Sequence, residues 1–201
     1  MAIELAELLV PDATTWRAWL LEHHASSPGV WLVLHKKGGA TTALTYELAV
    51  QEALCFGWID GQARSRDAES SLQRMTPRRP RSAWSVRNVE RVARLELAGR
   101  MHDAGRAQVR AAQEDGRWQR PYAGQADAVV PQDLAAALSA DPAARAWFEV
   151  LTAANRFAVL YRVQAAIRPE TRSRRISELV AGLARGETPH PQKRRPEARI
   201  G

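Results

Sequence analysis

The sequence predicts an α+β fold, in which a small, mainly antiparallel sheet with helices in the N-terminal half is followed by a mostly helical C-terminal half. Runs of β-branched and aromatic residues with the length of strands concentrate before residue 77. Beyond Gly99, capping residues and helical spacings of apolar side chains prevail. We therefore expect an α+β core over residues 1–100, a helical region packed on it over 101–186, and a mobile basic tail over 187–201.

The N-terminal half is expected to begin with a helix over residues 12–24. Asp12 is a typical capping residue, and Trp16, Trp19 and Leu20 recur at helical spacing. These tryptophans should therefore lie in the core.

A strand is predicted over residues 30–37, where β-branched and aromatic residues follow a Pro-Gly break. Thr45 then caps a helix that closes at Gly57. Further strands are expected over residues 58–65 and 70–76, before a loop that two prolines keep irregular.

The helix after this loop is capped by Ser82 or Ser85 and ends at Gly99. Its predicted apolar face consists of Val86, Val89, Ala93 and Leu97, and the opposite face carries Arg87, Arg91 and Arg94. Later helices are expected over residues 103–115, 131–139, 142–154, 156–167 and 169–185.

The formal charge of +7 arises mainly from arginine, which pairs with oxyanions through two hydrogen bonds. This charge has two alternative interpretations: the protein binds an anionic partner, or its basic surface is merely solvated. Cys55 is the single cysteine, so the chain has no internal disulfide. No run of about 18 apolar residues could span a bilayer, and the N-terminus lacks the pattern of a signal peptide. We expect a cytoplasmic protein without membrane contact.

Trp58 and Asp60 form the first part of the candidate site. They are two residues apart in an expected strand, so the indole and the carboxylate face the same way. A carboxylate beside an indole is partly desolvated, and it serves as an acid or base or pairs with an arginine. Asp60 is therefore the candidate catalytic residue, with a fixed ion pair to a loop arginine as the alternative.

The proline-stiffened loop before the next helix forms the second part. Its arginines come just ahead of a helix N-terminus, where backbone N–H groups also attract an anion. In the alternative, the serines only cap the helix and the arginines point to water. The candidate ligand-binding residues are Trp58, Arg78, Arg79, Arg81, Ser82, Trp84, Ser85 and Asn88. The histidines lack zinc-like spacing and no phosphate-binding glycine motif occurs, so we expect neither a metal nor a cofactor.

Short motifs spread over most of the chain point to a known family. They lie at residues 29–32, 44–46, 52–61, 76–82, 84–85, 88, 130–131, 155–156 and 170–172. With these motifs the chain resembles the YdeI/OmpD-associated family, often labelled bacteriocin-protection proteins. The resemblance implies no particular catalytic residue, and the label implies an indirect role in stress resistance. An association with an outer-membrane porin would require export, for which the sequence has no signal peptide.

Two functions therefore compete. In the first, this family member binds an anionic or aromatic small molecule in a pocket of tryptophan, aspartate and arginine, as an enzyme or as a stress-resistance factor. In the alternative, a nucleic-acid-binding accessory protein uses the arginine-rich loop and the arginine face of the following helix. The sequence predicts neither a reaction type nor an oligomeric state.

Overall fold

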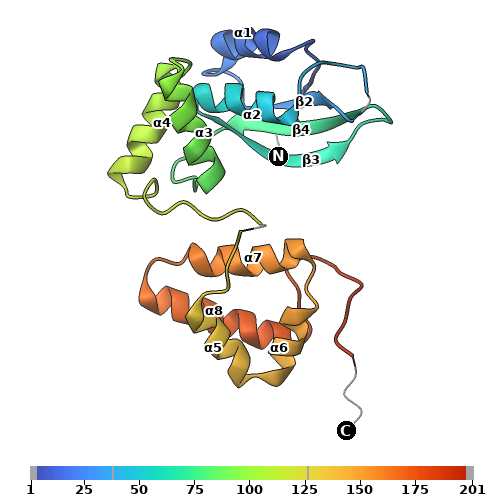
Figure 1. The fold of residues 1–201 in the computed structure, drawn as a ribbon, viewed down its shortest axis with the longest axis vertical. Helices are drawn as coiled ribbons and strands as arrows, with labels where there is room; N and C mark the ends of the chain where they lie inside the picture. Colours follow the sequence, from blue (N-terminus) through green and yellow to red (C-terminus); the bar gives the residue numbers. More distant parts are fainter. Residues whose placement is uncertain (1–3, 38, 126, 198–201) are drawn as a thin grey trace. The chain divides into compact units, whose positions relative to one another are not determined.

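The computed structural model of the protein describes residues 4–37, 39–125 and 127–197. Contacts between Cα atoms divide the chain into two compact units, Met1–Pro121 and Tyr122–Gly201. In the described ranges, strands occur only in the first unit, and the second is helical (Figure 1). The predicted α+β class is confirmed. No helix in these ranges has the length and apolar character needed to cross a membrane.

The sheet of the first unit has the strand order β1-β2-β4-β3. β1 runs parallel to β2, while β4 runs antiparallel to both of its neighbours. The three longer strands were predicted, but β1 was missed because two residues are too few to show an alternating pattern. The strands are β1 (Glu7–Leu8), β2 (Val30–His35), β3 (Trp58–Ser65) and β4 (Ser70–Pro77).

The strand register gives the sheet one apolar face beneath two helices. Val30 and Asp60 both lie opposite Met75, and Trp58 lies opposite Pro77. Because directly paired residues share a face, Trp58 and Asp60 point to the same side, as predicted. The helices α1 (Ala13–His23) and α2 (Tyr46–Cys55) cover this side (Figure 1) and complete the core of the unit.

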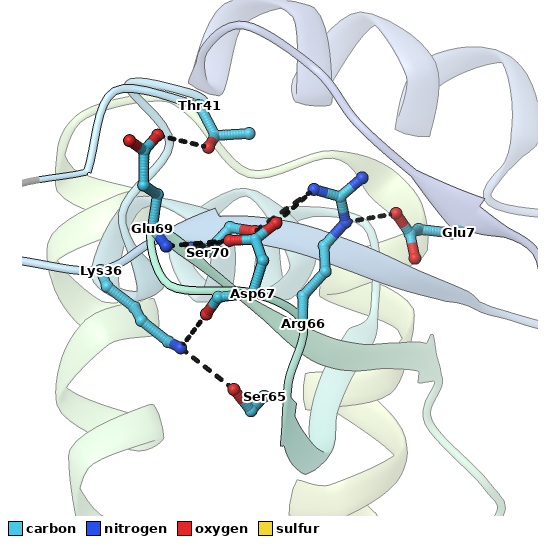
Figure 2. A network of polar contacts seen from close by, with 8 residues as sticks. All are labelled: Glu7, Lys36, Thr41, Ser65, Arg66, Asp67, Glu69 and Ser70. Carbon is cyan, nitrogen blue, oxygen red and sulfur yellow. Dashed lines mark hydrogen bonds and ion pairs between the residues drawn. The ribbon is translucent and has the colours of Figure 1, made fainter.

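A polar network closes the turn between β3 and β4 (Figure 2). Asp67 accepts hydrogen bonds from the backbone N–H groups of Glu69 (2.9 Å) and Ser70 (2.7 Å). Arg66 donates to Asp67 (2.8 Å) and to Glu7 (2.6 Å), which ties the hairpin to β1. Since these charges satisfy one another, the network supports the sheet and is not a candidate site.

The helix α3 (Val86–Leu97) buries a face that only partly overlaps the predicted one. Asn88, Val92 and Leu95 are buried, whereas Val86 and Leu97 are exposed by 37% and 90%. The predicted residues and the buried residues both recur at helical spacing, so spacing alone does not distinguish the two sets. The prediction chose the set that is entirely apolar, whereas the buried set includes an asparagine. Of the predicted apolar face, Val89 packs against the core, whereas Val86, Ala93 and Leu97 are exposed, so the prediction is wrong for these three residues.

The helix α4 (Asp103–Glu114) packs against α2 and belongs to the first unit, so this unit extends to Pro121, beyond the boundary expected after residue 100. Gly105 allows the close approach. A Cβ atom at this position would lie 2.2 Å from the carbonyl oxygen of Cys55.

Within its described residues, the second unit has its own core and four helices. The predicted boundary between the second and third of these helices is wrong. The helix expected over residues 142–154 ends at Glu149, and the next begins at Ala153. Thr152 causes the break, because its hydroxyl accepts the backbone N–H of Asn155 (3.3 Å) as an N-cap. The helices are α5 (Gln132–Ala140), α6 (Pro142–Glu149), α7 (Ala153–Gln164) and α8 (Pro169–Ala184).

Part of the expected mobile tail makes specific contacts within the second unit. The fully buried Asn155 donates from Nδ2 to the carbonyl oxygen of His190 (2.9 Å) and accepts the backbone N–H of the same residue (2.7 Å). Residues 198–201 of that tail lie outside the described residues.

Candidate functional site

The candidate site centres on residues 78–85, named here the arginine loop, which connects β4 to α3. The backbone N–H of Ser82 donates to the carbonyl oxygen of Arg79 (3.0 Å), so residues 79–82 form a tight turn with Pro80 second and Arg81 third. Arg81 has a φ of 63°, in the left-handed region that favours glycine. A side chain in this conformation costs about 1 kcal/mol.

Arg78 and Trp84 brace the loop from the inside. Arg78 is only 6% exposed, and its Nη1 donates to the carbonyl oxygen of Ala83 (3.1 Å). Its Cζ lies 3.6 Å from the centre of the Trp84 ring, which packs edge-on against Trp118 at 4.9 Å. The structure thus brings two predicted site residues together, in a cation–π contact that supports the loop.

The outer side of the loop carries unbalanced positive charge. Arg79 and Arg81 are exposed. Arg117 donates to the carbonyl oxygen of Ser82 (2.6 Å) and pairs with Asp115 (2.7 Å). The hydrogen bond from Arg117 to Asp115, reinforced by the charge of Arg81, holds the pKa of Asp115 below its usual value. Arg117 and Arg81 both act on the single carboxylate of Asp115, and the exposed Arg79 adds a further positive charge to the loop. The surplus positive charge suits an anion.

Ser85 and Asn88 build the start of α3. The Ser85 hydroxyl accepts the backbone N–H of Asn88 (3.2 Å), so Ser85 is the cap and the capping alternative holds for this residue. Asn88 is 5% exposed, and its side-chain oxygen accepts a hydrogen bond from Arg91 (2.8 Å). The Ser85 hydroxyl and the Asn88 side-chain oxygen thus both accept hydrogen bonds from α3 itself.

Trp58 belongs to the core of the first unit. Its side chain is fully buried, packs edge-on against Trp16 and Trp19, and donates from Nε1 to the carbonyl oxygen of His24 (3.0 Å). An indole without exposed surface contacts no ligand in this conformation.

Asp60 is partly exposed and is bound from α2. Its Oδ2 accepts the hydroxyl of Tyr46 (2.7 Å). Burial, together with this hydrogen bond to the carboxylate, raises the pKa of Tyr46. Of the two alternatives for Asp60, an ion pair with a loop arginine is not what the structure records, because the close partner is a tyrosine.

Each of the two units matches a different protein-family model. Residues 8–108, half of the chain, match the model of a domain of unknown function, DUF8412. The chain belongs to the DUF8412 family. Residues 127–186 match the family model described as Bacteriocin-protection, YdeI or OmpD-Associated, which confirms the predicted family over the second unit. The motifs at residues 29–88 that also suggested it lie in the DUF8412 match. No curated protein and no solved structure matches the chain.

One pair in the DUF8412 unit was missed by sequence reasoning. Arg91 donates from Nε to Glu47 (3.0 Å), and this hydrogen bond lowers the pKa of Glu47 to about 2. The carboxylate therefore stabilises the fold above its unfolded pKa, and that stabilisation is lost as the pH falls towards 2. Glu47 and Arg91 lie on different helices, so no local spacing could have revealed the pair.

Proposed function

We propose that the arginine loop of the DUF8412 unit binds an anionic small molecule that carries a phosphate or carboxylate group. The observation that supports this most is the left-handed backbone at Arg81. A glycine at position 81 would make the loop more stable, yet the sequence has an arginine there, with its guanidinium group exposed at the tip of the turn. Costly backbone conformations concentrate at functional sites, where binding outweighs stability.

The ligand contacts fall to Arg79 and Arg81, with Arg117 beside them. Arg78 and Trp84 hold the loop in shape from below. Because Trp58 and Trp84 are at most 2% exposed, the proposed ligand is anionic rather than aromatic. The proposal concerns binding and not catalysis. A catalytic role for Asp60 would instead involve Tyr46, its hydrogen-bond partner.

A nucleic acid is the second candidate, and it would use the exposed Arg87 and Arg94 of α3 as well. Arg91, the central member of that predicted face, is ion-paired to Glu47 and is therefore already neutralised. This pairing favours the small anion. A protective role against bacteriocins, which the description of the second family names, would then be indirect.

Calorimetric titration with inorganic pyrophosphate at low ionic strength tests the proposal. We expect the Arg79→Gln/Arg81→Gln double variant to bind at least about 30-fold more weakly, because it loses two charge-assisted contacts that each contribute about 1–2 kcal/mol. The matched control, Arg94→Gln, removes an exposed charge from α3 and should leave the affinity unchanged. Equal affinities of the double variant and the unaltered protein would contradict the proposal.

A DNA duplex serves as the second ligand in the same experiment. If Arg94→Gln weakens duplex binding as strongly as the loop variants do, and pyrophosphate does not bind, the nucleic-acid function replaces the small anion.

A further inference from the structure

The second unit contains a groove beside α6 that the proposed function does not use. Its volume is about 540 Å³, within the range of sites that hold small organic groups. Two glutamates, Glu149 and Glu197, lie at its edge. The rest of the lining is apolar and consists of Pro142, Ala143, Ala146, Trp147, Val150 and Pro196.

The C-terminal wall of this groove is held in place by Gln192. Its Nε2 donates to the carbonyl oxygens of Val150 (3.3 Å) and Arg194 (2.9 Å), and its Oε1 accepts the backbone N–H of Thr152 (3.1 Å). Asn155 donates to the same oxygen (2.8 Å). The segment that leads to Pro196 and Glu197 is therefore anchored to the end of α6 by a saturated amide.

Trp147 is fixed on the helix side of the groove. A Cβ atom at Gly186 would lie 2.8 Å from Cζ2 of this indole, so the ring packs directly on the glycine backbone. Gly186 has a φ of 78°, which suits a glycine that ends α8. The indole thus remains in place as part of the lining.

The charge of the groove is opposite to that of the chain. Its lining includes two carboxylates and no basic residue, whereas the whole chain has a formal charge of +7. Glu149 pairs with Arg145 (2.9 Å), but both side chains are about 60% exposed. An exposed pair of this kind contributes little to stability, so the carboxylate of Glu149 can exchange Arg145 for a cationic ligand at low cost. An indole face also attracts cations.

We propose that this groove binds a cationic peptide segment, in which a lysine or arginine meets Glu149 and Glu197 and a neighbouring apolar side chain packs on Trp147. Charge complementarity selects the cation, and the apolar lining selects a partner with hydrophobic side chains. The inference is independent of the arginine loop, which has the opposite charge and lies in the other unit.

Fluorescence anisotropy with a labelled peptide, Ala-Lys-Leu-Lys-Leu-Ala, tests the proposal on the full chain. We expect the Glu149→Gln/Glu197→Gln double variant to bind this peptide at least about five-fold more weakly. The peptide with glutamate in place of lysine should not bind. Gln192→Ala, which frees the C-terminal wall without removing charge, should also weaken binding.

The matched control is the Glu170→Gln/Glu178→Gln double variant. It removes the same charge from α8, and Glu178 pairs with Arg174 in the same spacing as Glu149 with Arg145. This control should bind as the unaltered protein does. Equal losses of peptide affinity in the two double variants would show that the peptide is held only by general electrostatic attraction, and this result would overturn the proposal. The proposal would also be overturned if the peptide did not bind to the unaltered protein. Thermal melts by circular dichroism verify that each variant is folded.

Discussion

Replacing Gly105 by alanine is expected to destabilise the first unit by about 3 kcal/mol, because the added methyl group collides with backbone that cannot move aside. The Cβ atom would lie 2.2 Å from the carbonyl oxygen of Cys55 and 2.8 Å from that of Leu54. The same substitution in an unobstructed helix stabilises by up to about 1 kcal/mol. Urea unfolding followed by tryptophan fluorescence measures the effect, since six of the seven tryptophans lie in this unit.

Gly182→Ala in α8 is the matched control. This glycine is also buried in a helix, but its Cβ atom would meet only the flexible carboxylate of Glu187, at 3.2 Å. We expect a gain of about 0.5–1 kcal/mol in the stability of the second unit. If Gly105→Ala stabilised its unit in the same way, the close packing of α4 on α2 would be refuted.

Replacing Glu52 by glutamine is expected to lower the free energy of unfolding of the first unit by about 2–3 kcal/mol, the second largest effect that we predict. This carboxylate is 4% exposed, pairs with Arg17 (2.8 Å) and also contacts Arg100. Arg17 additionally donates to the carbonyl oxygen of Arg100 (2.8 Å), so the cluster links α1, α2 and the segment before α4. Removing one partner of a buried pair typically costs about 3–5 kcal/mol, and we expect less because both arginines are more than one-third exposed.

Glu47→Gln, on the same helix, separates burial from charge. Glu47 also binds an arginine, but its side chain is 47% exposed. Exposed pairs contribute about 0–1 kcal/mol, so this variant should lose less than about 1 kcal/mol in the same urea experiment. Equal losses for Glu52→Gln and Glu47→Gln would contradict the structural role assigned to the buried carboxylate.

Local signals in the sequence account for most of the fold. Asp12, Thr45 and Ser85 cap helices in the structure, and the alternation of Trp58 and Asp60 places both on one face of the sheet. Each of these features depends on residues within a few positions, where spacing and capping chemistry decide the outcome.

The site was harder to predict, because it depends on contacts between distant segments. Arg78 looked like its neighbours Arg79 and Arg81 in the sequence, yet it is buried over an indole while they face solvent. The left-handed backbone of Arg81 was also hidden, since turns with this conformation normally show glycine or asparagine at that position. Trp58 was expected at a ligand and lies in the core, because sequence alternation does not tell which face is covered.

The stability and the anion affinity of Arg81→Gly together test the central claim most directly. We expect the free energy of unfolding to rise by about 1 kcal/mol, because glycine relieves the left-handed backbone, while pyrophosphate binding weakens about 5- to 10-fold. Arg79→Gly is the control, since it should weaken binding without any gain in stability. An Arg81→Gly variant that keeps full affinity for pyrophosphate would contradict the proposal that the chain retains this arginine to bind an anion.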